Sequence, residues 1–459
     1  MHQIPCQLGR RACLTNASRE LPGARGDMIA QLLEAPRLVQ LQMLEGAEHV
    51  GTRLWDIGER AWLEILRDAG RRFVDDQLPL GGQPIDLSEH ARLVSEATGV
   101  PTLRAVKASL ALADLLSTME DVLDAQAPVA SRDGGEGWVL APAGRHVAVR
   151  IPGSYPTFNA AWLVALALRR PTLLCAAGDP FTPVRLIEAL HAAGLPDGAV
   201  SLCFDEADAL FERADQVVCP GDELPQPEGP PGRVKRYHRG SSKAVLLGAG
   251  DDRLWPRLAA MAVQGSGRLC TSLSALLVDG DALEPAAALA AALARWPVAP
   301  LDDAEAIVPA FPDRALARRI DAAIAAAEAR GAIDLSARSG AGQRVVELDG
   351  ACFLRPTVLL VDRGDPLFGA EFPFPFVTVA SVPRAEAPAA CCGSLIVSLI
   401  GHDRALLLRL ILEPTIDKVF HGEHIDRGHR SSDPHEGFLA DFLFHKKAVW
   451  PPIERARLS

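Results

Sequence analysis

Cys270 is the residue whose surroundings most favour chemistry. It ends the segment Q-G-S-G-R-L-C over residues 264–270, which predicts a helix end, a glycine-rich turn and then a strand. Glycines let a backbone approach a ligand closely. Free backbone N–H groups beside a turn can lower a thiol's pKa and hold an oxyanion. Most single cysteines are instead small buried apolar residues, and the local sequence leaves both interpretations open.

Histidines form the second group of candidates. His238 stands in the segment Y-H-R-G-S-S-K at 237–243, and an imidazole with an ordinary pKa of ~6.5 can serve as a general base. A linker residue that bonds to backbone is the alternative. Five of the twelve histidines cluster near the C-terminus, at His421, His424, His429, His435 and His445. The spacing implies no third metal ligand, so we interpret this cluster as a polar loop near an active-site mouth and predict no metal.

Composition excludes several classes of protein. Of the 459 residues, 47 are Lys or Arg and 58 are Asp or Glu, so the net charge is −11. A nucleic-acid partner is therefore unexpected, because nucleic-acid binders carry a basic footprint. The nine cysteines are odd in number and include no C-x-x-C, which favours reduced thiols and a cytoplasmic protein. No apolar run reaches the ~18 residues of a membrane span. Residues 1–27 are interpreted as a leader, either disordered or extra sequence ahead of Met28.

Hydrophobic periodicity indicates two α/β lobes. Residues 28–127 read as helices with breaks at 78–84 and 99–101, and residues 137–151 read as two strands of a hairpin. Strands and helices then alternate over short connections, which is typical of parallel sheets. The predicted strands are 172–175, 200–204, 216–219, 244–247, 274–278, 358–361, 376–379 and 395–400, and the predicted helices are 160–168, 183–193, 206–213, 252–263, 283–296 and 314–330.

The chain resembles the aldehyde dehydrogenase superfamily in several segments that occur in the right order. They are I-P-G-S-Y-P at 151–156 beside that family's P-W-N-F-P, A-G-L-P-D-G at 193–198 beside A-G-L-P-x-G, the Cys270 segment beside G-Q-x-C, F-L-R-P-T at 353–357 beside F-x-x-P-T, E-F-P-F-P at 371–375 beside E-I-F-G-P, and K-K-A-V at 446–449 beside K-T-V. The resemblance covers residues 54–450 and rests on order and spacing rather than on one motif. It favours the nucleophilic interpretation of Cys270.

The resemblance implies two Rossmann-like α/β lobes and a small β oligomerisation hairpin. A cofactor-binding lobe would comprise residues 28–136 and 151–235, and a catalytic lobe residues 236–445. The hairpin at 137–150 and a terminal strand within 446–459 would build a homodimer or homotetramer. In the active site between the lobes, the Cys270 thiolate would attack an aldehyde, hydride would pass to a nicotinamide cofactor, and the resulting thioester would be released by water or another thiol.

The resemblance also assigns roles to other residues. Ser154 occupies the position of the family's oxyanion-binding Asn, and Asn159 is a possible substitute that we interpret instead as a helix cap. His238 stands where the family has its general-base Glu. Glu371 would steady the cofactor's ribose, and Phe374 would line the nicotinamide pocket.

Several departures bear on the cofactor. Ala176 replaces the family's cofactor-gripping Lys, and Gly221-Asp222 replaces its Gly-Ser pair at a phosphate-facing helix start, where an aspartate would repel a pyrophosphate. Asp179 would accept from a ribose hydroxyl and oppose a 2′-phosphate, so NAD is preferred to NADP. Arg185 or Lys235 could compensate, although each reads more simply as a surface charge.

The departures point to a thioester-handling branch. Members of the family that use coenzyme A as co-substrate also lack the general-base Glu and the cofactor-gripping Lys. The base can be lost because a thiol needs less activation than water. We therefore expect a reaction between an aldehyde and an acyl thioester. The alternatives are a hydrolytic aldehyde dehydrogenase and a degenerate, non-catalytic member that acts as a partner subunit.

Overall fold

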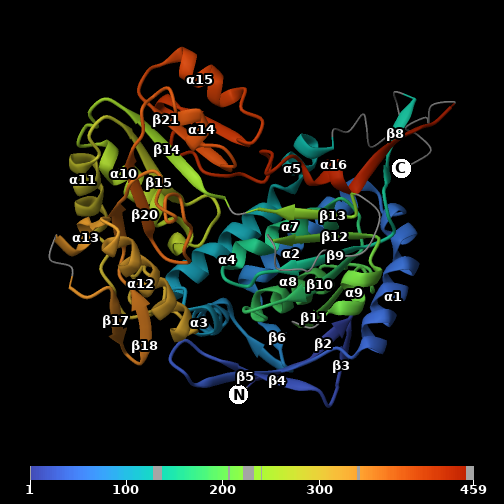
Figure 1. Ribbon diagram of the computed structural model, residues 1–459. Coiled ribbons are helices and arrows are strands. Elements are labelled where there is room, and N and C mark those ends of the chain that lie inside the picture. The colour runs from blue at the N-terminus through green and yellow to red at the C-terminus, as the bar shows by residue number, and fades with distance from the viewer. Residues whose placement is uncertain are drawn as a thin grey trace.

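Two α/β lobes lie side by side in the computed structural model, which describes residues 2–127, 137–204, 207–220, 232–238, 240–338 and 342–450 (Figure 1). The first lobe holds the N-terminal part of the chain, and the second holds most of the chain beyond residue 241. The predicted fold class, two Rossmann-like lobes with a small extra β unit, is confirmed. In the described part of the chain, no helix is long and apolar enough to cross a membrane.

The first lobe is built on a seven-stranded sheet in the order β13-β12-β9-β10-β11-β2-β3. The strands from β13 to β11 run parallel, as the alternation of strands and helices predicts, while β2 and β3 add an antiparallel edge. The strands span β2 (Cys6–Leu8), β3 (Arg11–Cys13), β9 (Val147–Ile151), β10 (Thr172–Ala176), β11 (Val200–Phe204), β12 (Gln216–Pro220) and β13 (Val234–Tyr237). Apolar side chains bury both faces of this sheet, as a parallel sheet requires.

Helices cover both faces of this sheet. They are α1 (Arg37–Trp55), α2 (Glu59–Asp75), α3 (Leu87–Thr98), α4 (Thr102–Ser117), α5 (Met119–Gln126), α7 (Ala160–Ala167), α8 (Phe181–Ala192) and α9 (Asp208–Arg213), with the 3₁₀ turn η1 (Pro156–Asn159) ahead of α7. The predicted break at 99–101 is confirmed. Helix α3 ends at Gly99 with φ 74°, and the backbone there packs so closely on Ala310 of the second lobe that a Cβ would lie 2.1 Å from its carbonyl oxygen.

The second lobe repeats the architecture with a sheet in the order β16-β19-β20-β15-β14-β21-β22. Every neighbouring pair from β19 to β22 is parallel, and β16 is an antiparallel edge. The strands span β14 (Ser242–Leu247), β15 (Leu273–Asp279), β16 (Ile333–Asp334), β19 (Thr357–Leu360), β20 (Phe376–Ser381), β21 (Ile396–Ile400) and β22 (Lys418–His421). The other elements are α10 (Leu254–Ala262), η2 (Gln264–Gly267), α11 (Leu283–Leu293), α12 (Arg314–Ala329), α13 (Leu335–Arg338), the hairpin β17 (Val345–Leu348) and β18 (Ala351–Leu354), α14 (Ala387–Ala390), α15 (Arg404–Ile411) and η3 (Gly422–His424).

The predicted hairpin over residues 137–150 is wrong. Strand β8 (Trp138–Pro142) pairs with β23 (Phe444–Ala448) near the C-terminus, whereas β9 lies in the middle of the first sheet between β10 and β12. The apolar residues of β9 are buried on both faces, which a two-stranded hairpin cannot provide. The β8–β23 pair projects from the body beside the label C (Figure 1).

The interpretation of residues 1–27 as a leader is also corrected. They contribute β2 and β3 to the first sheet, and β1 (His2–Ile4) and β4 (Ser18–Pro22) flank β5 (Met28–Leu33) in a separate three-stranded sheet. Ile4 and Cys6 are fully buried. Strand β5 also interrupts the region predicted as helical, whereas the short hairpin of β6 (Leu78–Leu80) and β7 (Gln83–Ile85) lies at the predicted break over 78–84.

The chain returns to the first lobe near its end. Helix α16 (Leu439–Leu443) packs against α5 and α7, and Leu439, Ala440 and Leu443 belong to the first lobe's apolar core. The segment between β22 and α16 therefore crosses from one lobe to the other, so the boundary predicted at residue 445 falls too late.

Candidate functional site

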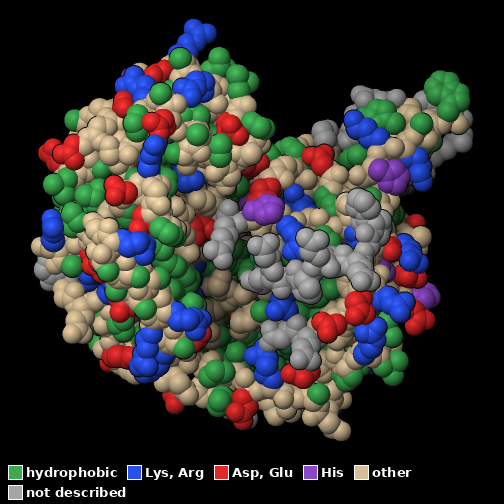
Figure 2. All heavy atoms as spheres, viewed as in Figure 1, with side chains coloured by type: hydrophobic (Ala, Val, Ile, Leu, Met, Phe, Trp, Pro, Cys, Tyr) green, Lys and Arg blue, Asp and Glu red, His purple; other side chains and the backbone are tan. Residues whose placement is uncertain are grey.

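A cavity of about 1740 Å³ lies between the lobes. The first lobe contributes α4, α5, η1, α7 and the ends of β9, β12 and β13, and the second contributes the nucleophile loop, defined here as residues 264–270, and residues 371–376. The surface is hollowed between the two bodies (Figure 2). Cys270 belongs to the wall of this cavity, so the structure brings the sequence-predicted thiol to the space between the lobes.

The nucleophile loop adopts an unusual backbone. Gly265, Ser266 and Gly267 have φ values of 53°, 60° and 73°, three successive residues in the left-handed region. Glycine is required at the third position, because a Cβ on Gly267 would lie 2.5 Å from the backbone of Phe374. The turn therefore reverses the chain after α10 and presents Cys270 just before β15.

Arg268 fixes this loop to the rest of the molecule. Its guanidinium donates to four backbone carbonyls, those of Thr98 at 2.6 Å, Ala310 at 2.8 Å, Ser154 at 3.1 Å and Pro373 at 3.2 Å. Burial lowers the pKa of Arg268 to about 10, yet the group stays charged at neutral pH. One side chain thus ties the nucleophile loop to the end of α3, to the segment before η1 and to two loops of the second lobe.

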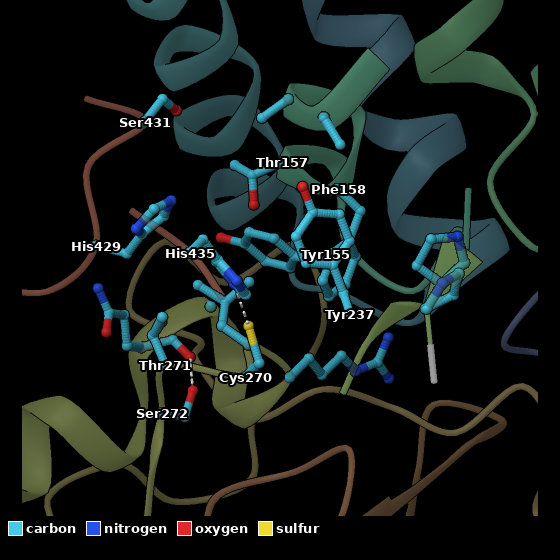
Figure 3. Close-up of a pocket in the computed structure, with 18 of the residues that line it drawn as sticks. Tyr155, Thr157, Phe158, Tyr237, Cys270, Thr271, Ser272, His429, Ser431 and His435 are labelled. Atoms are coloured by element: carbon cyan, nitrogen blue, oxygen red, sulfur yellow. Dashed lines mark hydrogen bonds between the residues drawn. The ribbon is translucent and has the colours of Figure 1, made fainter. Parts of the chain in front are cut away.

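The Cys270 backbone is held by residues 240–242, where the chain enters the second lobe; these residues are called the interlobe linker. The Ser242 hydroxyl donates to the Cys270 carbonyl at 2.8 Å, and a Cβ on Gly240 would lie 1.7 Å from that oxygen. The Sγ atom lies 3.4 Å from Nε2 of His435 (Figure 3). Burial, followed by the negative charge of Glu371, raises the pKa of the thiol to about 12, which keeps Cys270 protonated at neutral pH.

His435 reaches the sulfur from the segment that crosses between the lobes. Its ring packs edge-on against the rings of Tyr237, with centroids 5.1 Å apart, and His429, with centroids 5.0 Å apart. Burial, followed by the nearby charge of Lys418, lowers the pKa of His435 to about 4, so the imidazole is neutral at pH 7. Lys418 contacts Nδ1 of His429 at 2.6 Å. The histidine cluster thus includes a contact to the candidate nucleophile, which its interpretation as a polar loop did not predict.

Glu436, the residue that follows His435, is itself firmly anchored. It has a positive φ of 52°, and three contacts hold it: its N–H donates to Asp417 at 2.8 Å, its carboxylate accepts from the N–H of His238 at 2.8 Å, and its carbonyl accepts from Lys235 at 2.7 Å. The left-handed conformation costs a non-glycine residue ~1–3 kcal/mol and persists only where the surroundings impose it. These contacts fix the position from which His435 points at Cys270.

Glu371 and Phe374 both line the cavity, as expected of cofactor-binding residues. The Glu371 carboxylate accepts from the N–H groups of Ser241 at 2.7 Å and Gly240 at 3.1 Å, so it also fixes the interlobe linker. Phe374 is 1% exposed and packs among Phe311, Phe372 and Phe376, which places most of its ring in the core.

The structure places the predicted base and oxyanion donor less favourably. His238 lines the cavity but is exposed, and among the described contacts it is His435 that meets the Cys270 sulfur. Tyr155 and Thr157 form part of the cavity wall (Figure 3), whereas Ser154 is not among the described residues that line the cavity. Asn159 stands at the N-cap position of α7, as predicted, but its side chain makes no capping hydrogen bond. Its buried amide instead donates to the Pro156 carbonyl at 2.9 Å and accepts from Trp162 at 2.7 Å.

Other cofactor predictions need correction. The Asp179 carboxylate is buried and accepts from Phe181 and Thr182 at the start of α8, so it serves the helix rather than a ribose. Arg185 is also buried rather than a surface charge, and it donates to three backbone carbonyls. Lys235 is half-buried against Glu436. Gly221 and Asp222 lie outside the described residues.

The interlobe cavity forms a crevice at the carboxyl ends of the first sheet's strands. From β9 the chain proceeds to β10 and β11 on one side, then crosses to β12 and β13 on the other. Ligands of open α/β sheets bind at such a switch point. Arg150 and Pro152, at the end of β9, and Cys219 and Pro220, at the end of β12, line the cavity there. The same cavity therefore joins this crevice to the Cys270 thiol.

A metal site finds no support in the described residues. No group of three or more His, Cys, Asp or Glu side chains in the described ranges is arranged to hold a metal ion. His421 ends β22 and His424 lies in η3, and both side chains are exposed.

Comparison with known proteins identifies the fold. Neither a family model nor a curated protein sequence matches the chain. Among solved structures, a succinate-semialdehyde dehydrogenase from Burkholderia pseudomallei superposes with a TM-score of 0.78 at 17% identity, covering 97% of this chain and 98% of that one. An indole-3-acetaldehyde dehydrogenase complexed with NAD⁺ gives 0.77 at 18% identity, covering 97% and 96%. An aldehyde dehydrogenase from Brucella melitensis biovar abortus gives 0.76 at 15%, covering 96% of each chain. The chain therefore has the fold of the aldehyde dehydrogenases.

Proposed function

We propose that this protein is an NAD(P)-dependent oxidoreductase of the aldehyde dehydrogenase superfamily, with Cys270 as its nucleophile. The observation that carries the proposal is the shared cavity, in which the Cys270 thiol and the crevice at the switch point of the first sheet line one space. A thiol and a dinucleotide-binding crevice are the two components that oxidation of an aldehyde through a thioester needs.

The residues at the crevice fit a nicotinamide dinucleotide. Strands β9 and β12 end at this crevice, and Arg150 places a positive charge in the cavity wall there. A bound cofactor would supply the hydride acceptor for the aldehyde carbon. The chain's own part is to bind the aldehyde in the cavity and to form the thioester bond at Sγ of Cys270. The proposal covers both NAD and NADP, because Asp179, on which the preference for NAD rested, caps α8.

Within this reaction class we propose an interconversion of an aldehyde and an acyl thioester, with coenzyme A as a possible co-substrate. Ala176 ends β10 where a lysine would grip a cofactor, and position 238 carries no carboxylate to activate water. A thiol acceptor needs less help from a base than water does. Hydrolysis to a carboxylic acid is the second candidate, because His435 places a neutral imidazole next to the thiol.

Nucleotide binding tests the proposal first. Titration of the purified protein with NAD⁺, NADH, NADP⁺ and NADPH should show binding of at least one of them, and failure of all four would favour a non-catalytic partner subunit. If the protein binds a nucleotide, Cys270→Ser should abolish aldehyde oxidation. The matched control is Cys392→Ser, which changes an exposed cysteine outside the cavity. A Cys270→Ser variant with full activity would remove the mechanism.

Dependence on coenzyme A separates the two branches. If the thioester branch is right, aldehyde-dependent reduction of the nucleotide should require added coenzyme A and yield an acyl thioester. Equal rates without coenzyme A, with a carboxylic acid as the product, would establish hydrolysis instead.

A further inference from the structure

We propose that His435 is the general base and general acid of the Cys270 thiol, an inference that rests on the proposed function of Cys270 as nucleophile. The geometry is direct, because Nε2 of His435 lies 3.4 Å from Sγ in the wall of the interlobe cavity (Figure 3). The assignment differs from the prediction from sequence, which gave the base to His238. It makes the segment between β22 and α16 part of the active site.

The ring of His435 is held in place by packing rather than by hydrogen bonds at its far nitrogen. Tyr237 and His429 pack edge-on against it, and Glu436 is fixed by contacts to Asp417, His238 and Lys235. Nδ1 is buried and has no hydrogen-bond partner among the described residues. The nitrogen that does have a partner is the one that meets the sulfur, so the thiol is the polar contact toward which the imidazole is aimed.

The protonation states of the two groups give the imidazole a role. The thiol is protonated at neutral pH, and a protonated thiol is a poor nucleophile. The imidazole is neutral at neutral pH and can accept a proton. The charged groups that set these states come from every side: Lys418 from β22, Lys235 from β13, Glu371 from the loop before β20 and Glu436 from the crossing segment, with Tyr237 and His429 as uncharged ring neighbours.

The proposed steps balance as follows. As Sγ attacks the carbonyl carbon, the S–H bond breaks, its proton passes to Nε2, the S–C bond forms and the C=O π pair moves to oxygen. Loss of hydride from the former aldehyde carbon to the bound cofactor would re-form the C=O bond, and Nε2 gives its proton to solvent water, which leaves His435 neutral again. In release of the acyl group, His435 takes the proton of the attacking water or thiol, the oxygen or sulfur of that nucleophile bonds to the acyl carbon, the S–C bond breaks, and Cys270 leaves as a thiolate. That thiolate then recovers a proton from Nε2. General acid–base assistance of this kind contributes ~10²–10⁴-fold to a rate.

An activated ester tests the pair without any nucleotide. p-Nitrophenyl acetate should acetylate Cys270 and release p-nitrophenolate in a burst, whose rate measures thiol attack alone. Cys270→Ser should abolish the burst. His435→Gln should slow it by at least about 100-fold, whereas His424→Gln, which changes an exposed histidine of the same C-terminal region, should leave it unchanged.

The pH dependence of the burst distinguishes a base from a merely structural residue. In the wild type the rate should be nearly constant between pH 6 and 8, because neither the thiol nor the imidazole changes its protonation state there. In His435→Gln attack would depend on the rare thiolate, so the rate should rise roughly tenfold for each pH unit. His435→Ala supplied with free imidazole should recover part of the wild-type rate.

Each contrary outcome is distinct. A burst that survives Cys270→Ser would overturn Cys270 as the nucleophile and with it the proposed function. A burst that needs Cys270, but is equally fast and has the same pH profile in His435→Gln, would overturn the role of His435 alone. Loss of the burst in His238→Gln but not in His435→Gln would return the role to His238. Because imidazole rescue needs only a folded cavity, rescue in His435→Ala rules out misfolding as the cause of the slow rate.

Discussion

Arg268 shows how a single side chain can position a reactive one. It stands two residues before Cys270, and its bonds reach four segments that are distant in the sequence. All four acceptors are neutral carbonyls, so the buried guanidinium acts through its forked set of donors rather than through an ion pair. The hydrogen bonds of this one side chain therefore fix the nucleophile loop to the segments around the cavity.

We expect Arg268→Lys to weaken this fastening. An ammonium cannot reach the same four carbonyls, and hydrogen bonds from charged groups contribute about 1.5–3 kcal/mol each. The free energy of unfolding in urea should fall by about 2–4 kcal/mol, and acetylation of Cys270 by p-nitrophenyl acetate should be slower. Arg67→Lys, at an exposed position of α2, is the control. Unchanged stability and acetylation in Arg268→Lys would show that the four contacts are dispensable.

The sequence predicts some of these residues and not others, for a physical reason. Cys270 is found because its glycine-rich turn is local, and glycine spacing can be read directly. The partnership with His435 depends on a contact across 165 positions in the sequence, and no local pattern distinguishes this histidine from its neighbours His424 and His429. The prediction of Asp179 as a ribose acceptor is wrong because its carboxylate accepts hydrogen bonds from the backbone N–H groups of Phe181 and Thr182, at the start of the helix that follows it.

At the scale of elements, the switch point between β9 and β12 is the feature that matters for the cofactor. Arg150 lies in the cavity wall at the end of β9 and also contacts the Cys175 sulfur at 2.9 Å. A guanidinium at the carboxyl end of a central strand attracts phosphate groups, and it forms stronger hydrogen bonds with them than neutral donors do.

We expect Arg150→Gln to weaken dinucleotide binding by about tenfold, the loss of one charge-assisted contact at ~1.4 kcal/mol. Titration with whichever nucleotide the wild type binds gives the two dissociation constants. Arg145→Gln, in the turn before the same strand and paired with Asp215 outside the cavity, should bind as the wild type does. Equal affinities for wild type and Arg150→Gln would place the phosphates elsewhere.

The β8–β23 pair carries the proposal of a homodimer or homotetramer. A two-stranded ribbon is marginally stable in water on its own, and this one projects from the body (Figure 1). Its Lys446 and Lys447 side chains are exposed. No third strand among the described residues pairs with the ribbon, so its edges offer backbone groups to a further strand. A second copy of the chain would cover the ribbon.

Light scattering coupled to size-exclusion chromatography should therefore give a mass of two or four times 49.0 kDa. Val139→Pro should reduce the oligomer to monomers, because proline removes a backbone donor within β8. Leu14→Pro, which changes an exposed residue outside β8 and β23, should leave the mass unchanged. A monomeric wild type would remove the proposal.

At the scale of the whole molecule, buried neutral histidines link stability to pH. Burial lowers the pKa of His90 to about 3, and the positive charge of Arg185 adds to the shift. As the pH falls, a histidine whose pKa is lowered by folding binds a proton in the unfolded chain at a higher pH than in the folded one. Stability should therefore be complete above pH 6.5 and should be lost as the pH falls from 6.5 toward 3.

The contribution of His90 can be isolated by substitution. Between pH 7 and pH 5, the free energy of unfolding of the wild type should fall by roughly 2 kcal/mol more than that of His90→Gln. Urea titrations at the two pH values give the difference, with the exposed His402→Gln as control. An identical pH dependence for His90→Gln and the wild type would show that folding does not lower the pKa of His90.

The arrangement of the lobes was predictable because it follows from alternation, a property of consecutive residues. The pairing of β8 with β23 and the return of α16 to the first lobe were not, because each joins segments that lie far apart in the chain. Val147 and its neighbours look the same in a sequence whether their strand forms a hairpin or enters a buried sheet, and only the partners available in three dimensions decide.

The crossing segment has one further consequence. His435 is tethered on one side to β22 and on the other to α16 of the first lobe, while Cys270 stands just before β15 of the second lobe. Through Arg268, the loop that carries Cys270 is also bonded to the first lobe, at Thr98 and Ser154. Sulfur and imidazole are therefore each held from both lobes, so the distance over which the proton travels is a property of the assembled interface and of neither lobe alone.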